Sequence, residues 1–511
     1  MRGESRIGRN TTWLGLGTVL SSLFVIVQMK VFTVTLSLEG YGTLLALRAL
    51  AGVITALAVM GLPQLATRFL PQFESRGSRK DTLRFFLMLM LFLGLSVQAA
   101  LLLSLWGREF LLSNFSMGEE GLAFFNLTLF LALAMSVNEM SLNLFQGIRR
   151  MSWVAVSQVL MQGLLALHFI LVRGNLEPAY ALKLYAIYFA VPGFLMLAAF
   201  PFLIPRGGEG NLRIRKGEIF SYWKLGLLLR WMVLAAMDLD RYFLSFFASM
   251  ELIAFFNIPA RIMGVSRRLL QSSITSLQTE VSRLHEERRD SDLPARLGIF
   301  LRGQVSLSLW MATLLFLLAH PLILLVSSED YLKGLPLLAI LLLTLPLSSL
   351  SSPLEAAFRG TRGLGKVLTG NLIWALAYFG SFPFLVRGMG LVGLGVAQVG
   401  ALLLQALWML WMGRRLGLLG KGPLASRLIR SLFPSITALL VAFLIPGARG
   451  LSPSLAGMLL GSLVLLLHSL LLLRGSTLFS REEKAWLLGR VRPAPFRERL
   501  ETLLGVGEGK A

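Results

Sequence analysis

Apolar runs of about 20 residues recur from the start of the chain almost to its end, and they limit the fold more than any other feature of the sequence. A helix of about 20 residues crosses a hydrocarbon layer about 30 Å thick. The apolar residues are continuous instead of alternating, and the runs exceed the roughly ten residues of a barrel strand. We therefore predict an all-α polytopic membrane protein.

Fourteen transmembrane helices are expected, because fourteen such runs are separated by polar turns. The even number places both chain ends on the same side of the membrane. The runs lie at 12–36, 42–61, 83–105, 122–145, 153–172, 180–204, 222–246, 252–277, 298–326, 334–357, 367–386, 390–413, 428–446 and 453–473.

Composition excludes several functions. Hydrophobic residues make up 55% of the 511 residues and charged residues only 15%, so the chain is too apolar for a soluble domain. The net charge of +22 comes from basic residues in short loops, which argues against nucleic-acid binding. The sequence has no cysteine, its four histidines lack metal-ligand spacing, and it has no phosphate-binding loop motif. We expect no metal and no cofactor. Protons and sodium ions are the candidates for ion coupling.

Lysine and arginine accumulate in alternate loops, which predicts the orientation. With the N-terminus in the cytoplasm, 33 of the 49 basic residues of the chain fall in inner loops and ends, and both termini are cytoplasmic. The outer loops are too short to hold a separate domain. The basic residues expected outside are Arg108, Arg173, Lys333, Arg387 and Arg449.

An internal repeat divides the chain. Phe145–Arg149 reads FQGIR and Phe358–Arg362 reads FRGTR, 213 positions later. We predict an N-terminal lobe of helices 1–6 at 1–205 and a pseudo-symmetric lobe of helices 7–12 at 206–414. Two additional helices follow at 415–474, and then a cytoplasmic basic tail at 475–511. The tail is expected to hold an interfacial helix over 480–504, a loosely ordered segment being the alternative.

Two charged triads follow the same repeat. Lys30, Glu39 and Arg48 are nine residues apart, with Glu39 in the turn after the first helix. Arg241, Glu251 and Arg261 are ten apart, with Glu251 in the turn after the seventh helix. Both turns fall on the expected outer side.

Four segments together resemble the polysaccharide and O-antigen-type flippases of the multidrug/oligosaccharidyl-lipid/polysaccharide (MOP) exporter superfamily. The resemblance covers essentially the whole chain. The segments are residues 12–22, the turn SLEGYGTLLALRA at 37–49, the run GLPQLATRFLPQF at 61–73, and FQGIRRMS at 145–152.

The resemblance implies a transporter of the bacterial cytoplasmic (inner) membrane, and not an enzyme. It would move undecaprenyl-pyrophosphate-linked oligosaccharide repeat units to the outer leaflet by alternating access through a central cavity. The expected partners are this lipid and the bilayer, the expected state is a monomer, and contact with polysaccharide polymerase machinery is a further expectation. The alternatives are a lipid II-type flippase, a cation-coupled drug exporter of the same superfamily, and, less favoured, a polytopic glycosyltransferase or ligase.

Depth in the membrane favours substrate binding by the cations of the triads. Each lies nine or ten residues from its turn, which is about 13–15 Å along a helix and close to the membrane centre. Lipid tolerates such charges poorly, so we expect them to line an aqueous, cationic cavity. Arginine suits a pyrophosphate because its planar fork of donors matches phosphate oxygens. Snorkelling, or pairing with a buried carboxylate, is the alternative. The set comprises Lys30, Arg48, Arg241 and Arg261.

Further charged residues extend this set. Arg230, Asp238 and Arg241 fall close to one face of the seventh helix, where Asp238 either neutralises Arg241 or acts in gating or ion coupling. Glu139 in the fourth helix is either a coupling site or a helix-packing hydrogen bond, and Glu355 has a comparable depth. Arg302 either guides an anionic headgroup or follows the inward bias of positive charge. Glu39 and Glu251 are expected to close the outer rim through salt bridges.

Overall fold

A computed structural model describes residues 2–76, 79–112, 121–148, 150–204, 216–237, 239–361, 363–419, 429–444, 453–474, 478–480 and 483–484. The described residues form helices and no strand, which confirms the all-α prediction. Two compact units divide the chain. The first holds Met1–Asn257 with Val326–Ser328, and the second holds Ile258–Leu325 with Glu329–Ala511.

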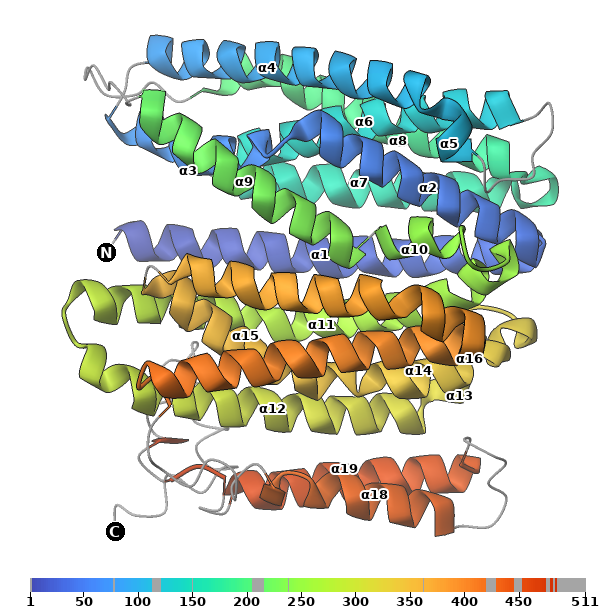
Figure 1. Cartoon of the computed structure of the whole chain (residues 1–511), viewed down its shortest axis with the longest axis vertical. Helices are drawn as coiled ribbons and strands as arrows, with labels where there is room; N and C mark the ends of the chain where they lie inside the picture. The colour runs from blue at the N-terminus through green and yellow to red at the C-terminus, as the bar shows by residue number, and fades with distance from the viewer. Residues whose placement is uncertain are drawn as a thin grey trace. The chain divides into compact units, whose positions relative to one another are not determined.

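The helices of the first unit end close to the predicted positions, and all but α1, which begins ten residues early at Arg2, also begin close to them (Figure 1). A helix absent from the sequence prediction, α3, follows the second expected span. The seventh expected span is covered by α9 and α10, with Asp238 outside the described residues. The elements are α1 (Arg2–Thr35), α2 (Leu38–Val59), α3 (Leu62–Arg76), α4 (Arg79–Trp106), α5 (Arg108–Leu112), α6 (Gly121–Gly147), α7 (Met151–Leu171), η2 (Arg173–Asn175), α8 (Pro178–Leu203), α9 (Lys216–Met237), α10 (Leu239–Leu244) and the first turns of α11 (Met250–Glu286).

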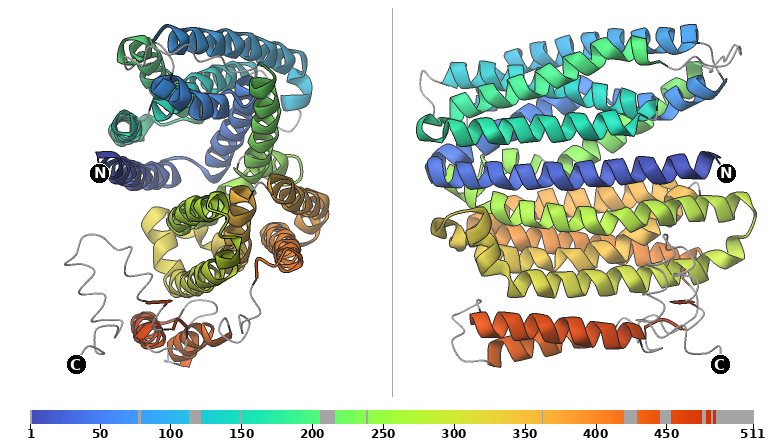
Figure 2. Two further views of the ribbon diagram at one scale, coloured as in Figure 1. Left: turned by 90° about the vertical axis from the view of Figure 1, so that its left-hand side faces the viewer. Right: turned by 180° about the vertical axis from the view of Figure 1, so that it is seen from behind.

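The second unit continues α11 past its expected end at residue 277. Its ninth and tenth expected spans are each divided into two helices. α18 and α19 lie side by side (Figure 2). The elements are η3 (Asp290–Asp292), α12 (Leu293–Leu317), α13 (Ala319–Val326), η4 (Glu329–Gly334), α14 (Leu335–Leu342), α15 (Thr344–Gly360), α16 (Leu364–Arg415), α18 (Phe433–Leu444) and α19 (Leu455–Arg474).

α16 contains the turn expected between residues 386 and 390. Its 52 residues would extend about 78 Å if straight, far more than a membrane needs. At Gly390 the backbone has φ 56° and ψ −133°, a conformation open to glycine only, and the chain doubles back there (Figure 1). A side chain at Gly393 would collide with the carbonyl oxygen of Leu385, so the two halves approach closely.

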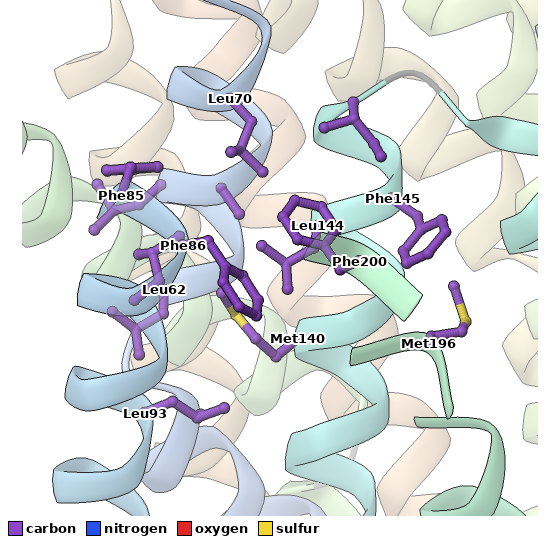
Figure 3. Packing of buried hydrophobic residues seen from close by; sticks show 14 of the residues in the cluster. Leu62, Leu70, Phe85, Phe86, Leu93, Met140, Leu144, Phe145, Met196 and Phe200 are labelled. Carbon is purple, nitrogen blue, oxygen red and sulfur yellow. The ribbon is translucent and has the colours of Figure 1, made fainter. Parts of the chain in front are cut away.

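Aromatic and leucine side chains from four helices form a core in the first unit. α3, α4, α6 and α8 all contribute, and Figure 3 shows their side chains meeting. The rings of Phe86 and Phe200 stack with centroids 4.8 Å apart, and Phe145 meets Phe200 edge-on at 5.9 Å. The amphipathic helix α3 therefore packs into this core through one face and leaves Arg68 exposed.

The outward surfaces of the long helices are apolar, and this identifies a multi-pass membrane protein. Leu102 on α4, Leu171 on α7 and Phe202 on α8 are each more than half exposed. A soluble protein does not expose apolar side chains over so many helices. Among the described residues, ten helical stretches are long and apolar enough to cross a membrane, and the number fourteen stays a prediction.

Candidate functional site in the first unit

The turn between α1 and α2 sets the position of the first triad. Ser37 caps α2, its hydroxyl oxygen accepting a hydrogen bond from the backbone N–H of Gly40 at 3.1 Å. Glu39 lies exposed in the first turn, where a carboxylate interacts favourably with the helix dipole. Arg48 follows ten residues after Leu38, about 15 Å further along the helix. The cap sets where α2 begins, so the distance of Arg48 from the turn is the one that the sequence predicts.

Arg48 is half-buried, and its guanidinium lies over an aromatic ring. Its guanidinium carbon is 4.1 Å from the ring centroid of Tyr185 on α8, and that ring is 2% exposed. Among the residues that the structure describes, no carboxylate forms an ion pair with Arg48. A cation on a span that is otherwise largely buried, stabilised by a ring and by no counter-charge, is suited to an anionic ligand.

A hydrogen-bonded chain fixes the ring below Arg48. The Tyr185 hydroxyl donates to Gln28 Oε1 on α1 at 3.1 Å. Gln28 Nε2 donates in turn to Gln162 Oε1 on α7 at 2.9 Å and to the Gln162 carbonyl oxygen at 3.1 Å. Gln162 therefore makes a packing contact between α7 and α1.

Lys30 belongs to the same unit as Arg48. It is half-buried on α1, and its Nζ donates a hydrogen bond to the backbone carbonyl oxygen of Ser327. The acceptor is neutral, so the bond leaves the positive charge of Lys30 uncompensated by this contact. The unit thus holds two half-buried cations on its first two helices.

The second triad is divided between the two units. Glu251 is exposed in the first turn of α11, as Glu39 is in α2, and Arg261 is half-buried on α11 in the second unit. Arg267, two turns further along, donates to the Thr344 hydroxyl at 2.9 Å. Arg241 lies on α10 and Arg230 on α9, but their side chains are outside the described residues, and so is the whole of Asp238.

Within the first unit, α2 contacts the start of α11 closely. Asn257 Nδ2 donates to the Tyr41 hydroxyl at 2.7 Å, and both side chains are almost completely buried. A Cβ atom at Gly42 would lie 1.8 Å from the Met250 carbonyl oxygen, so only glycine fits there. The other end of α2 contacts α9, where the Trp223 indole N–H donates to the Met60 carbonyl oxygen at 2.7 Å. These contacts fix α2 at both ends.

Glu139 and Glu355, the two glutamates expected at a comparable depth in the membrane, each lie next to an amide side chain. Glu139 is half-buried on α6, where Asn143 donates to its backbone carbonyl oxygen at 2.8 Å. In the second unit Gln405 Nε2 donates to Glu355 Oε1 at 3.2 Å and to Asn371 Oδ1 at 2.7 Å. Arg359 Nη2 lies 3.5 Å from the other Glu355 oxygen.

Arg302 has a carboxylate and an aromatic ring as its neighbours. It is 8% exposed on α12, forms an ion pair with Glu483 at the start of the tail, and lies 5.9 Å from the ring centroid of Phe479. This pairing accounts for a buried arginine without a substrate. Its role in substrate binding stays a prediction.

The comparisons with known proteins agree with this architecture. Residues 7–278 match a family described as polysaccharide biosynthesis protein. The chain belongs to this polysaccharide biosynthesis family. The resemblance predicted from the sequence is thereby confirmed. No curated protein sequence matches the chain.

Solved structures similar to this family member are transporters of the MOP superfamily. The lipid II flippase MurJ, in an inward closed conformation, has a TM-score of 0.68 at 16% identity, over 90% of this chain and 98% of that one. An inward-facing multidrug resistance MATE family transporter has 0.60 at 18%, over 78% and 94%. A MOP superfamily transporter from Pyrococcus furiosus has 0.58 at 17%, over 81% and 96%. At these identities the likeness shows the fold.

Sequence reasoning missed the residues that surround Arg48. Tyr185 gave no signal because aromatic residues are common throughout the apolar helices, with 34 phenylalanines, 8 tyrosines and 10 tryptophans in the chain. Tyr41, which pairs with Asn257 near the start of α2, was missed for the same reason. The one available signal was the polar character of Asn257 within an apolar run, because a buried amide needs a hydrogen-bond partner.

Proposed function

We propose that this protein is a flippase that translocates undecaprenyl-pyrophosphate-linked oligosaccharide repeat units from the inner to the outer leaflet by alternating access. The observation that carries the proposal is Arg48, a half-buried cation with a ring contact and no ion pair in the described part of the chain. Family membership and a fold that resembles lipid and drug transporters support it.

The chemistry of Arg48 suits a pyrophosphate. The Tyr185 ring stabilises the guanidinium through a cation–π contact, and the guanidinium carries five N–H donors, more than one ring can occupy. Two of those donors can bind two phosphate oxygens side by side. Lys30 adds a second positive charge in the same unit, and Arg261, Arg241 and Arg230 are proposed to complete a cationic path for the headgroup.

Transport is favoured over catalysis. A membrane glycosyltransferase or ligase typically needs catalytic groups on a sizeable outer segment, and the turns α1–α2 and α10–α11 are only a few residues long. A cation-coupled drug exporter would bind its cationic substrate poorly beside Arg48 and Lys30. A lipid II-type flippase is the second candidate, because the MurJ fold is similar over 90% of this chain.

Energy for the cycle is proposed to come from a proton or sodium gradient without a cofactor. Glu139, Asp238, Glu39 and Glu251 are the candidate coupling or gating residues, and the exposed Glu39 and Glu251 suit gating at the outer rim. We place the protein in the bacterial inner membrane with both termini in the cytoplasm, working as a monomer beside the polysaccharide polymerase.

The test is a flipping assay with the full chain in proteoliposomes and a fluorescent undecaprenyl-pyrophosphate-linked oligosaccharide. Loss of a charge-assisted hydrogen bond costs about 1.5–3 kcal/mol, so Arg48→Ala should slow flipping roughly 10- to 150-fold at limiting substrate. The matched control is Arg173→Ala, which removes an exposed arginine from η2. Normal flipping by the Arg48→Ala, Arg261→Ala double variant would rule out the proposal. Proton and sodium gradients, imposed separately, would identify the coupling ion.

A further inference from the structure

The contact between Arg48 and Tyr185 holds the guanidinium over an aromatic ring. With the guanidinium carbon 4.1 Å from the ring centroid, the attraction is to the face of the ring. An arginine carries five N–H donors, more than a contact with one ring can occupy. The ring therefore orients the cation while it leaves the hydrogen bonds for a ligand.

The ring itself is held from two other helices. Phe32 on α1 lies 6.1 Å from Tyr185, and Phe169 on α7 lies 5.5 Å from it, between ring centroids. The hydroxyl is tied to Gln28, which is tied to Gln162. Such a ring has little freedom to rotate or shift. An arginine stacked on it loses side-chain entropy before the ligand arrives, which lowers the cost of ordering at the moment of binding.

We propose that Tyr185 is the positioning residue that holds Arg48 with its edge donors toward the pyrophosphate of the lipid-linked substrate. This inference rests on the proposed function and adds a specificity device to it. Without the ring, the guanidinium can turn toward neighbouring backbone carbonyl oxygens, and its donors are then no longer aligned as a fork. Tyr185 acts through Arg48 and does not itself contact the ligand.

The experiment measures the affinity of the purified full chain for undecaprenyl pyrophosphate in detergent. Tyr185→Leu and Tyr185→Met both remove the ring, methionine filling more of its volume so that one folded variant is obtained. Each should bind roughly tenfold more weakly, the size of a partly desolvated cation–π contact. Tyr185→Phe keeps the ring and should stay within about threefold of the wild type. The matched control is Phe200→Leu, which opens a comparable cavity on the same helix, in the core where Phe200 meets Phe86 and Phe145.

A double-mutant cycle separates positioning from packing. In an Arg48→Ala background, loss of the Tyr185 ring should have no further effect on affinity, because the group that it positions is gone. Equal weakening by Phe200→Leu and Tyr185→Leu would overturn the inference in favour of a packing effect. Wild-type affinity in the ring-less variants, together with weak binding by Arg48→Ala, would overturn the positioning role and leave the proposed function standing. Unchanged affinity of Arg48→Ala itself would overturn both.

Discussion

Glu483 attaches the start of the C-terminal tail to α12, and its removal should release that segment. The carboxylate pairs with the buried Arg302 and also accepts a hydrogen bond from the Ser480 backbone N–H at 2.8 Å. Ser480 Oγ in turn accepts from the Glu483 backbone N–H at 3.2 Å, which completes a capping box. Phe479 and Leu478 pack with Ile299 of α12. We predict that Glu483→Gln keeps the capping acceptor and leaves the guanidinium of Arg302 without a counter-charge.

The cost follows from burial. Breaking a fully buried ion pair costs about 3–5 kcal/mol. The side chain of Glu483 is 22% exposed and the contact of Arg302 with Phe479 survives, so we expect a smaller value, about 2 kcal/mol. If the tail opens locally, this raises the open population roughly 30-fold.

Thiol labelling measures that population, since the chain has no cysteine of its own. Leu478→Cys places the only thiol at a position 1% exposed, where maleimide reacts only after opening. Labelling should accelerate roughly 30-fold in the Glu483→Gln variant. The exposed Glu329→Gln serves as the control. Arg302→Met with Glu483→Met should recover part of the protection, because no charge is then left buried. A labelling rate within about twofold of the parent in Glu483→Gln would refute the ion-pair argument.

A backbone conformation and a buried hydrogen bond give two further predictions about stability. Gly390→Ala should destabilise the protein by about 1–3 kcal/mol, because an L side chain is strained at φ 56°, whereas Gly388→Ala at an open position nearby should have little effect; thermal unfolding in detergent compares the two. Tyr41→Phe should cost about 1–3 kcal/mol, because the buried Asn257 amide loses its acceptor. A double variant with Asn257→Leu should recover stability in the same assay. Equal unfolding temperatures for Tyr41→Phe and the wild type would contradict this prediction.

Hydropathy predicted the helices because a helix that crosses a membrane needs a continuous apolar run, and that run lies within one segment of the sequence. The run at 180–204 corresponds to α8 at Pro178–Leu203, and the gap between residues 386 and 390 contains the turn at Gly390. α3 was not predicted, because its run GLPQLATRFLPQF is too polar to span and its helical stripe is stabilised only by packing on α4 and α6.

For the candidate site, the sequence predicted how far along its helix Arg48 lies but not which side chains it contacts. Counting residues from the turn placed Arg48 along α2, since the rise of a helix is constant. Which ring it meets depends on the rotation and crossing of α2 and α8, which no local pattern encodes. The same is true of Arg302. The sequence allowed either guidance of an anionic headgroup or ordinary inward bias of positive charge, whereas the structure pairs Arg302 with Glu483 in the tail.

The most direct test of the account compares two lipids that differ by one phosphate. Affinities of the wild-type chain and Arg48→Ala for undecaprenyl pyrophosphate and undecaprenyl monophosphate show whether Arg48 reads the pyrophosphate. We predict that the wild type prefers the pyrophosphate and that Arg48→Ala loses most of this preference, because its paired donors bind two adjacent phosphate groups. An Arg48→Ala variant that keeps the full preference would contradict the central claim.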